Sequence, residues 1–170
     1  MPHWISETIY KGREAIMETH GKEAILELLI QTDPEKTVEL ESEAGKVRMI
    51  PFGGKADGPL FHGIIEPCGV DTQITNAADV RHMSARYMLT GEDYTGAPCR
   101  IYVQNEGWFT DGARPKPWRS VPTFLTDSKA LAPILHRRNF IGEGQRDDDG
   151  LHIRFYKVTE EKAVESRGRM

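Results

Sequence analysis

Residues 61–107 read FHGIIEPCGVDTQITNAADVRHMSARYMLTGEDYTGAPCRIYVQNEG and decide the fold class. Apolar and polar residues alternate in four runs, 61–66, 70–75, 84–90 and 100–106. Successive side chains of a strand point to opposite faces, so this alternation is typical of β-strands. The breaks between the runs are rich in turn-forming residues, and the break GEDYTGAP predicts an antiparallel hairpin that joins 84–90 to 100–106.

Further runs on both sides of this stretch have the composition of strands. They are 24–32, 37–41, 47–52 and 151–158, with an extended segment at SVPTFLT, residues 120–126. Pro51 lacks the amide hydrogen that a central strand needs, so we expect the strand 47–52 to end there or to lie at an edge. About eight short strands at regular spacing favour an all-β fold, a single closed or nearly closed antiparallel β-barrel that is lipocalin-like or allene-oxide-cyclase-like.

The rest of the chain completes this domain organisation. Thr126-Asp127-Ser128 is typical of the start of a helix, so a short helix is expected near 127–137, limited by Pro133. Residues 1–22 form an N-terminal extension that can be an amphipathic helix or a strand. The barrel domain then covers 23–158, and 159–170 is a charged tail.

Composition excludes several classes of function. A formal net charge of -4 with interspersed signs offers no basic field for nucleic acid. The N-terminus lacks the pattern of a secretory signal, and no apolar run approaches a membrane span, so the expectation is a soluble cytoplasmic protein without a membrane partner. Cys68 and Cys99 form no CxxC motif, so we expect reduced thiols and no metal site.

Asp71 and Gln73 are the first candidate site. They share one face of the run 70–75, beside a glycine turn. If that face looks into a barrel, the carboxylate can act as a general base or hold a hydroxylated ligand. The alternative is that Asp71 accepts backbone N–H groups of the PCGVD turn.

Arg86, Tyr102 and Glu106 are the second candidate site. If 84–90 pairs with 100–106, Arg86 and Glu106 both lie away from the hairpin loop and can meet. A cation, a phenol and a carboxylate suit the enolisation of a carbonyl compound or a lyase reaction. The alternative is a cross-strand ion pair that fixes the register of the hairpin.

Three further residues are candidates for ligand binding. His62 shares a strand face with Glu66, but four residues of strand separate them by roughly 13 Å, so they are not a local metal pair. Trp108 and Lys116 flank the loop after the hairpin, where aromatic residues can cover a barrel mouth or contact another subunit.

Several stretches together resemble a known family, the domain-of-unknown-function family 3237, an assemblage of small β-barrel proteins. They are IPFGG at 50–54, FHGIIEPCGVDTQ at 61–73, ARYMLTGEDYTGAPCRIYVQNEG at 85–107 and FIGEGQ at 140–145. The resemblance covers roughly residues 24–158. Where the family's common pattern has Asp-Trp-Gln, this chain has Asp-Thr-Gln, with Thr72 in the tryptophan position. The resemblance implies the barrel; the family has no general activity to carry over.

These observations lead to one functional hypothesis and two alternatives. The sequence has no GxSxG, P-loop, GxGxxG or HExxH motif. We therefore expect a cofactor-independent β-barrel enzyme that carries out proton transfer, as a lyase, isomerase or cyclase, on a small oxygenated organic molecule. Asp71 and Glu106 would be the acid and base, with Arg86 and Tyr102 stabilising negative charge. One alternative is a lipocalin-like barrel that binds a small molecule without turnover. The other is a structural or assembly protein whose barrel is filled by side chains. We also expect a homo-oligomer.

Overall fold

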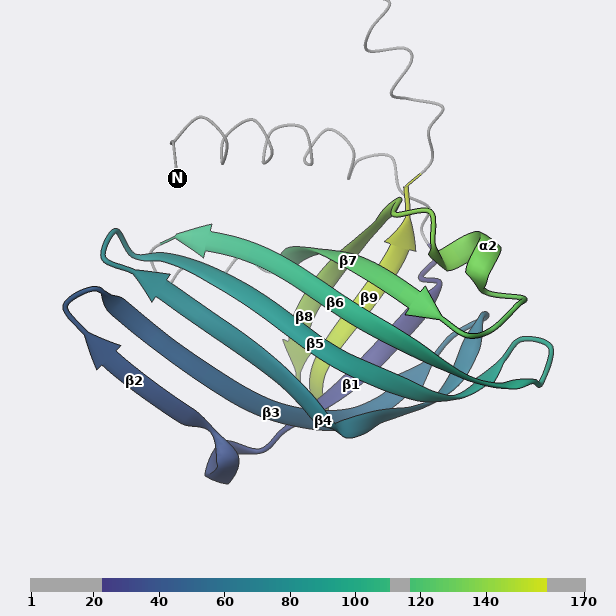
Figure 1. The fold of residues 1–170 in the computed structure, drawn as a ribbon, viewed down its shortest axis with the longest axis horizontal. Coiled ribbons are helices and arrows are strands. Elements are labelled where there is room, and N and C mark those ends of the chain that lie inside the picture. Colours follow the sequence, from purple (N-terminus) through teal and green to yellow (C-terminus); the bar gives the residue numbers. More distant parts are fainter. Residues whose placement is uncertain (1–22, 111–116, 159–170) are drawn as a thin grey trace, which may run out of the picture.

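A computed structural model of the chain describes residues 23–110 and 117–158. Eight antiparallel strands form a sheet in the order β1-β9-β8-β7-β6-β5-β4-β3, and the sheet closes into a barrel because β1 also pairs with β3 (Figure 1). The ninth strand, β2, pairs with the part of β3 that β1 does not reach. The strands are β1 Leu26–Thr32, β2 Val38–Ser42, β3 Gly45–Asp57, β4 Phe61–Asn76, β5 Val80–Asp93, β6 Pro98–Thr110, β7 Trp118–Thr126, β8 Phe140–Asp147 and β9 Gly150–Lys157. The prediction of an all-β antiparallel barrel is confirmed.

The predicted strands 61–66 and 70–75 are one long strand, β4. The predicted break between them, at Pro67-Cys68-Gly69, is an irregularity of the pairing with β5, whose register shifts between Ile65 and Val70. A bulge bends a strand without ending it. The predicted hairpin of 84–90 with 100–106 is confirmed as the centre of the β5–β6 pair.

Pro51 lies inside β3, where β3 changes partners. Residues 45–49 of β3 pair with β2, and residues 52–57 pair with β1. The carbonyl oxygen of Pro51 accepts the Asp33 N–H at 2.9 Å, so the backbone of Pro51 faces this gap between β2 and β1. The missing amide hydrogen therefore breaks no strand pairing, and β3 continues past the residue at this local edge.

Strand β8 was not predicted as a strand from its residues. It reads FIGEGQRD, and Gly142 and Gly144 stand where an alternating strand would carry inward side chains. A Cβ atom at Gly144 would overlap the indole of Trp118, and one at Gly142 would overlap the Ser120 hydroxyl. Glycine is required because β7 places larger side chains over β8, and this removes the apolar alternation that marks a strand.

The helical content is small, as expected. A 3-10 turn, η1, covers Pro34–Lys36, and the helix expected near 127–137 is α2, Ala132–Leu135. Neither helix in the part of the chain that the structure describes has the length or apolar character to cross a bilayer. The predicted N-terminal extension, 1–22, and the tail, 159–170, lie outside the described residues.

Apolar packing closes one end of the barrel and leaves the other end open. Leu89 of β5 is fully buried in the core, with other large side chains from every side of the barrel. These include Leu28, Phe61, Ile101, Leu131 and Phe155. Toward the other end of β5, Ala85 and Met83 line a cavity instead. The apolar core therefore fills one end of the barrel, and the polar side chains of the interior lie toward the other end.

Candidate ligand cavity

The open end of the barrel holds a cavity of about 290 Å³. Small residues on the inner face make this space. Asp71 of β4, Ala85 of β5 and Asn105 of β6 stand in one register row, so the short Ala85 side chain leaves room between the two polar ones. Adjacent strands are roughly 4.8 Å apart, which places the backbones of Asp71 and Asn105 about 10 Å from each other. Gly107 lines the cavity beside them.

Asp71 and Gln73, the first predicted site, both line this cavity. The Gln73 Nε2 group donates a hydrogen bond to Asp71 Oδ2 at 2.8 Å. Gln73 is only 5% exposed although it is polar. The two-residue spacing in β4 places both on one face, as the alternation in the sequence predicted, and in the structure this face lines the cavity.

Three other buried polar side chains line the same cavity. Tyr87, Asn105 and Ser120 are 4%, 9% and 6% exposed. The Tyr87 hydroxyl, Asn105 Oδ1 and Ser120 Oγ have no hydrogen-bond partner within residues 23–110 and 117–158. Burial raises the pKa of Tyr87 well above its ordinary value, and the negative charge of Asp71 raises it further. Tyr87 is therefore a neutral hydrogen-bond donor at all physiological pH values.

Two arginines and a tryptophan also line the cavity: Arg48 from β3, Arg146 from β8 and Trp118 from β7. Arg48 Nε lies 3.0 Å from a carboxylate oxygen of Glu39, so its charge is balanced from β2. Sequence reasoning did not assign Tyr87, Asn105 and Ser120 to the site. Tyr87 and Asn105 stand on the faces of β5 and β6 opposite to the candidates Arg86, Tyr102 and Glu106, and Ser120 lies on β7, where the sequence offered no candidate. Only the inward direction of each face identifies them.

The second predicted site does not join the first. Arg86, Tyr102 and Glu106 lie on the outer face of β5 and β6, because their neighbours Ala85, Tyr87 and Asn105 face inward. Arg86 is exposed and pairs in register with Gln104, and Glu106 pairs with Ser84. The expectation that Asp71, Arg86 and Glu106 line one cavity is wrong, since a period of two places them on opposite faces.

Glu106 belongs to a polar network in a shallow depression on the outer wall, where Gln104, Glu106, Trp108, Val121 and Thr123 meet. Its carboxylate accepts hydrogen bonds from Gln104 Nε2 at 2.8 Å and Ser84 Oγ at 3.3 Å, and lies 3.5 Å from His82 Nε2. Burial alone would raise the pKa of Glu106, but these hydrogen bonds and the His82 ring hold it below its ordinary value.

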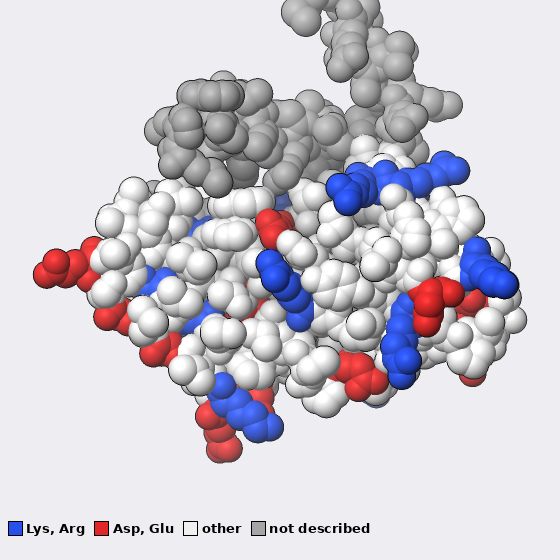
Figure 2. All heavy atoms as spheres, in the orientation of Figure 1, with Lys and Arg blue, Asp and Glu red and all other residues white. Residues whose placement is uncertain are grey.

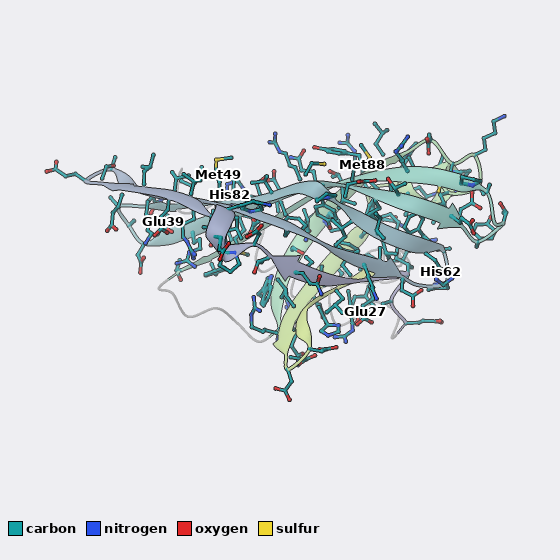
Figure 3. All side chains as sticks on the ribbon, turned by 90° about the horizontal axis from the view of Figure 1, so that it is seen from below. Glu27, Glu39, Met49, His62, His82 and Met88 are labelled. Carbon is teal, nitrogen blue, oxygen red and sulfur yellow. The ribbon has the colours of Figure 1, made fainter. Side chains whose placement is uncertain are left out.

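The predicted ligand-binding residues His62 and Trp108 lie apart from each other and outside the cavity lining. His62 is exposed and pairs with Asp57, and Figure 3 shows it toward the opposite end of the barrel from His82. Trp108 stacks on His82, with ring centroids 4.6 Å apart. Lys116 lies outside the described residues.

The outer face of β3 to β6 is turned toward the viewer in Figure 2, where charges of both signs are scattered among uncharged side chains. Large apolar side chains are exposed on β2, β3 and β4, namely Val38, Leu40, Met49, Ile64 and Ile74. The expected homo-oligomer stays a prediction.

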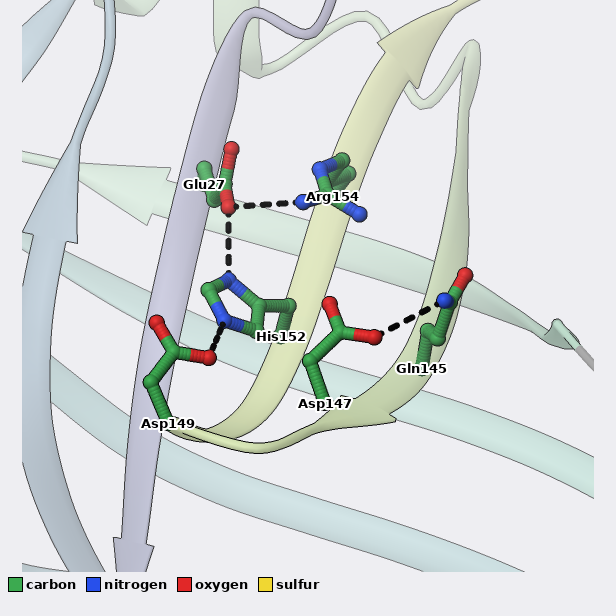
Figure 4. Close-up of polar contacts among 6 residues, drawn as sticks. All are labelled: Glu27, Gln145, Asp147, Asp149, His152 and Arg154. Atoms are coloured by element: carbon green, nitrogen blue, oxygen red, sulfur yellow. Dashed lines mark hydrogen bonds and ion pairs between the residues drawn. The ribbon is translucent and has the colours of Figure 1, made fainter.

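A cluster of charged residues ties β1 to β9 on the outer surface (Figure 4). His152 Nδ1 lies 2.7 Å from Glu27, and His152 Nε2 lies 2.7 Å from Asp149. Arg154 donates to the same Glu27 carboxylate at 3.1 Å. Hydrogen bonds that the His152 ring donates to the carboxylates of Asp149 and Glu27 raise the pKa of His152. Asp147, Asp149 and His152 could also surround a cation, but both ring nitrogens of His152 already contact carboxylates.

Comparisons with known proteins agree with this fold. Residues 22–158 match the model of a family described as a protein of unknown function, DUF3237. A protein of unknown function from Clostridium acetobutylicum is 27% identical, with a TM-score of 0.65 over 81% of this chain and 98% of that one.

Two more distant solved structures share the fold alone. A β-barrel-like protein from Acinetobacter baumannii has 23% identity and a TM-score of 0.64, over 81% of this chain and 94% of that one. An enzyme from Penicillium herquei has 14% identity and a TM-score of 0.54, over 83% and 96%.

Proposed function

The chain belongs to the DUF3237 family of proteins of unknown function, and we propose that it is an enzyme that moves protons within a small oxygenated organic molecule held in the barrel cavity. One observation carries this proposal. Asp71 lines a cavity of about 290 Å³ together with Tyr87 and Ser120. That the Penicillium herquei neighbour is an enzyme adds support at the level of the fold.

The side chains suit proton abstraction next to a carbonyl group. Asp71 removes a proton from the carbon, the electron pair of that C–H bond forms a carbon–carbon double bond, and the π electrons of the carbonyl group move to its oxygen, which gives an enolate. Tyr87 and Ser120 donate hydrogen bonds to this oxygen, and the raised pKa of Tyr87 keeps its proton in place. Protonated Asp71 then returns the proton at another atom in an isomerase, or to a leaving group in a lyase.

This mechanism uses one carboxylate as both base and acid. Glu106, Arg86 and Tyr102 have no part in it, because they stand on the outer face of the same wall. The sequence suggested that the Arg86 guanidinium stabilises negative charge on the substrate. In this mechanism the neutral hydroxyl groups of Tyr87 and Ser120, on the inner face, stabilise that charge instead.

Hydrogen–deuterium exchange tests the proposal. The protein is incubated in D₂O with a panel of hydroxylated ketones and aldehydes, and ¹H NMR follows the C–H signal next to the carbonyl. We expect protein-dependent loss of this signal, or a rearranged product, for at least one member of the panel. Saturable binding without exchange would instead indicate a lipocalin-like binding barrel, and neither binding nor exchange would contradict both functions.

A further inference from the structure

The hydrogen bond between Asp71 and Gln73 fixes the direction of the Gln73 amide. An ionised carboxylate only accepts hydrogen bonds, so the NH₂ end of Gln73 must face Asp71 Oδ2, 2.8 Å away. The carbonyl oxygen, Gln73 Oε1, is then the remaining end of the amide. It is buried and has no hydrogen-bond partner in the described part of the chain. The pair thus presents a carbonyl oxygen beside a carboxylate.

The polar lining of the cavity carries donors, in Arg48, Arg146, Tyr87 and Ser120, and also acceptors, in Asp71 and Gln73. Asn105 Oδ1, in the register row of Asp71, is a further buried acceptor without a partner among the described residues. A buried acceptor is stabilised by an N–H or O–H donor and destabilised when it faces another acceptor. A ligand that fills this cavity must therefore bring donors toward Asp71 and Gln73, and a ligand carbonyl or ether oxygen at that position would be repelled.

We infer that the cavity takes vicinal diols, with one hydroxyl donating to Asp71 and its neighbour donating to Gln73 Oε1. This inference rests on the proposed function, in that it places the ligand in the same cavity. Two side-by-side acceptors match two hydroxyls on adjacent carbons. The hydroxyls of Ser120 and Tyr87 can donate in return to the ligand's oxygen atoms.

The size of the cavity sets the scale of the ligand. A dry cavity of roughly 150 Å³ accommodates benzene. The cavity here, about 290 Å³, has room for a single ring with substituents. Six-membered rings that carry one or two oxygen functions are therefore suitable probes.

Isothermal titration calorimetry with three such probes tests the inference: cis-cyclohexane-1,2-diol, cyclohexanol and 2-hydroxycyclohexanone. We expect the diol to bind about tenfold more tightly than either of the others, because each of those lacks one of the two donors. In Gln73→Met the affinity for the diol should fall about tenfold, while that for cyclohexanol changes by less than about twofold. Gln104→Met, the same change on the outer face, is the matched control and should leave all three affinities unchanged.

Equal or tighter binding of cyclohexanol or 2-hydroxycyclohexanone to the wild-type protein would overturn the inference, and so would failure of the diol to bind. The three wild-type titrations decide this even if Gln73→Met does not fold, which circular dichroism will show. The D₂O exchange experiment is separate. Exchange without preference for the diol rejects this inference alone, and diol binding without exchange rejects the proposed catalysis alone.

Discussion

Asp71 and Glu106 stand two strands apart on opposite faces of one barrel wall: Asp71 lines the cavity, and Glu106 lines a depression outside it. Ser84 pairs with Glu106, and its neighbour Ala85 pairs with Asp71. Adjacent residues of β5 point to opposite faces of the sheet, so Glu106 faces outward and Asp71 faces the interior. The two carboxylates cannot share a substrate. Of the four residues predicted to be catalytic, which were Asp71, Arg86, Tyr102 and Glu106, only Asp71 therefore lines the cavity.

Filling the space above Ala85 should block the cavity. Ala85 lies between Asp71 and Asn105 in one register row, and a leucine there would project into the gap. We expect Ala85→Leu to abolish protein-dependent deuterium exchange, with the cis-cyclohexane-1,2-diol affinity at least about tenfold lower. Calorimetry and thermal unfolding measure the two effects. A folded Ala85→Leu protein that binds the diol like wild type would place the ligand elsewhere.

Gly54 should tolerate no side chain. Its φ is +137°, and an added Cβ would overlap the carbonyl oxygen of Leu29 on β1. We expect Gly54→Ala to lower the free energy of unfolding in urea by about 3 kcal/mol or more, because backbone strain adds to the overlap. Gly96 is the matched control. Its φ is +83° with nothing within 4 Å of the added Cβ, so Gly96→Ala should cost only about 1 kcal/mol. Equal costs would contradict the close approach of β1 to β3.

The His152 cluster should make stability depend on pH. The pKa of His152 is raised above 6.5 in the folded state by Asp149 and Glu27. Its contribution is therefore fully present below pH 6.5 and is lost as the pH rises through the raised folded pKa. Urea unfolding at a series of pH values should show this loss in the wild-type protein and a flatter profile in His152→Gln. A wild-type stability that rises with pH in this window would contradict the ion pairs of Figure 4.

The barrel could be predicted from the sequence because its signal is local. Alternation in the runs 61–66, 70–75, 84–90 and 100–106 depends only on neighbouring residues, and the structure places one alternate set of each inside. Strand β8 could not be found in this way. Its glycines at 142 and 144 are required by Ser120 and Trp118 of another strand, a constraint that a local pattern does not contain.

The candidate site was only half predictable for a related reason. Alternation shows which residues share a face, and it does not show whether that face looks inward. Asp71 with Gln73, and Arg86 with Tyr102 and Glu106, both looked like polar faces that could enter a barrel. The closure of eight strands decides between them, because it turns Ala85, Tyr87 and Asn105 toward the interior and their neighbours toward solvent.

The exchange rate of the carbon-bound proton in D₂O, compared between Asp71→Asn and Glu106→Gln, tests the central claim most directly. Both variants change one carboxylate to an amide of the same size, on opposite faces of one wall. We predict that Asp71→Asn loses exchange by at least about 100-fold, as expected for removal of a general base, while Glu106→Gln stays within about twofold of wild type. Loss of exchange in Glu106→Gln with full activity in Asp71→Asn would contradict the account and move the chemistry to the outer face.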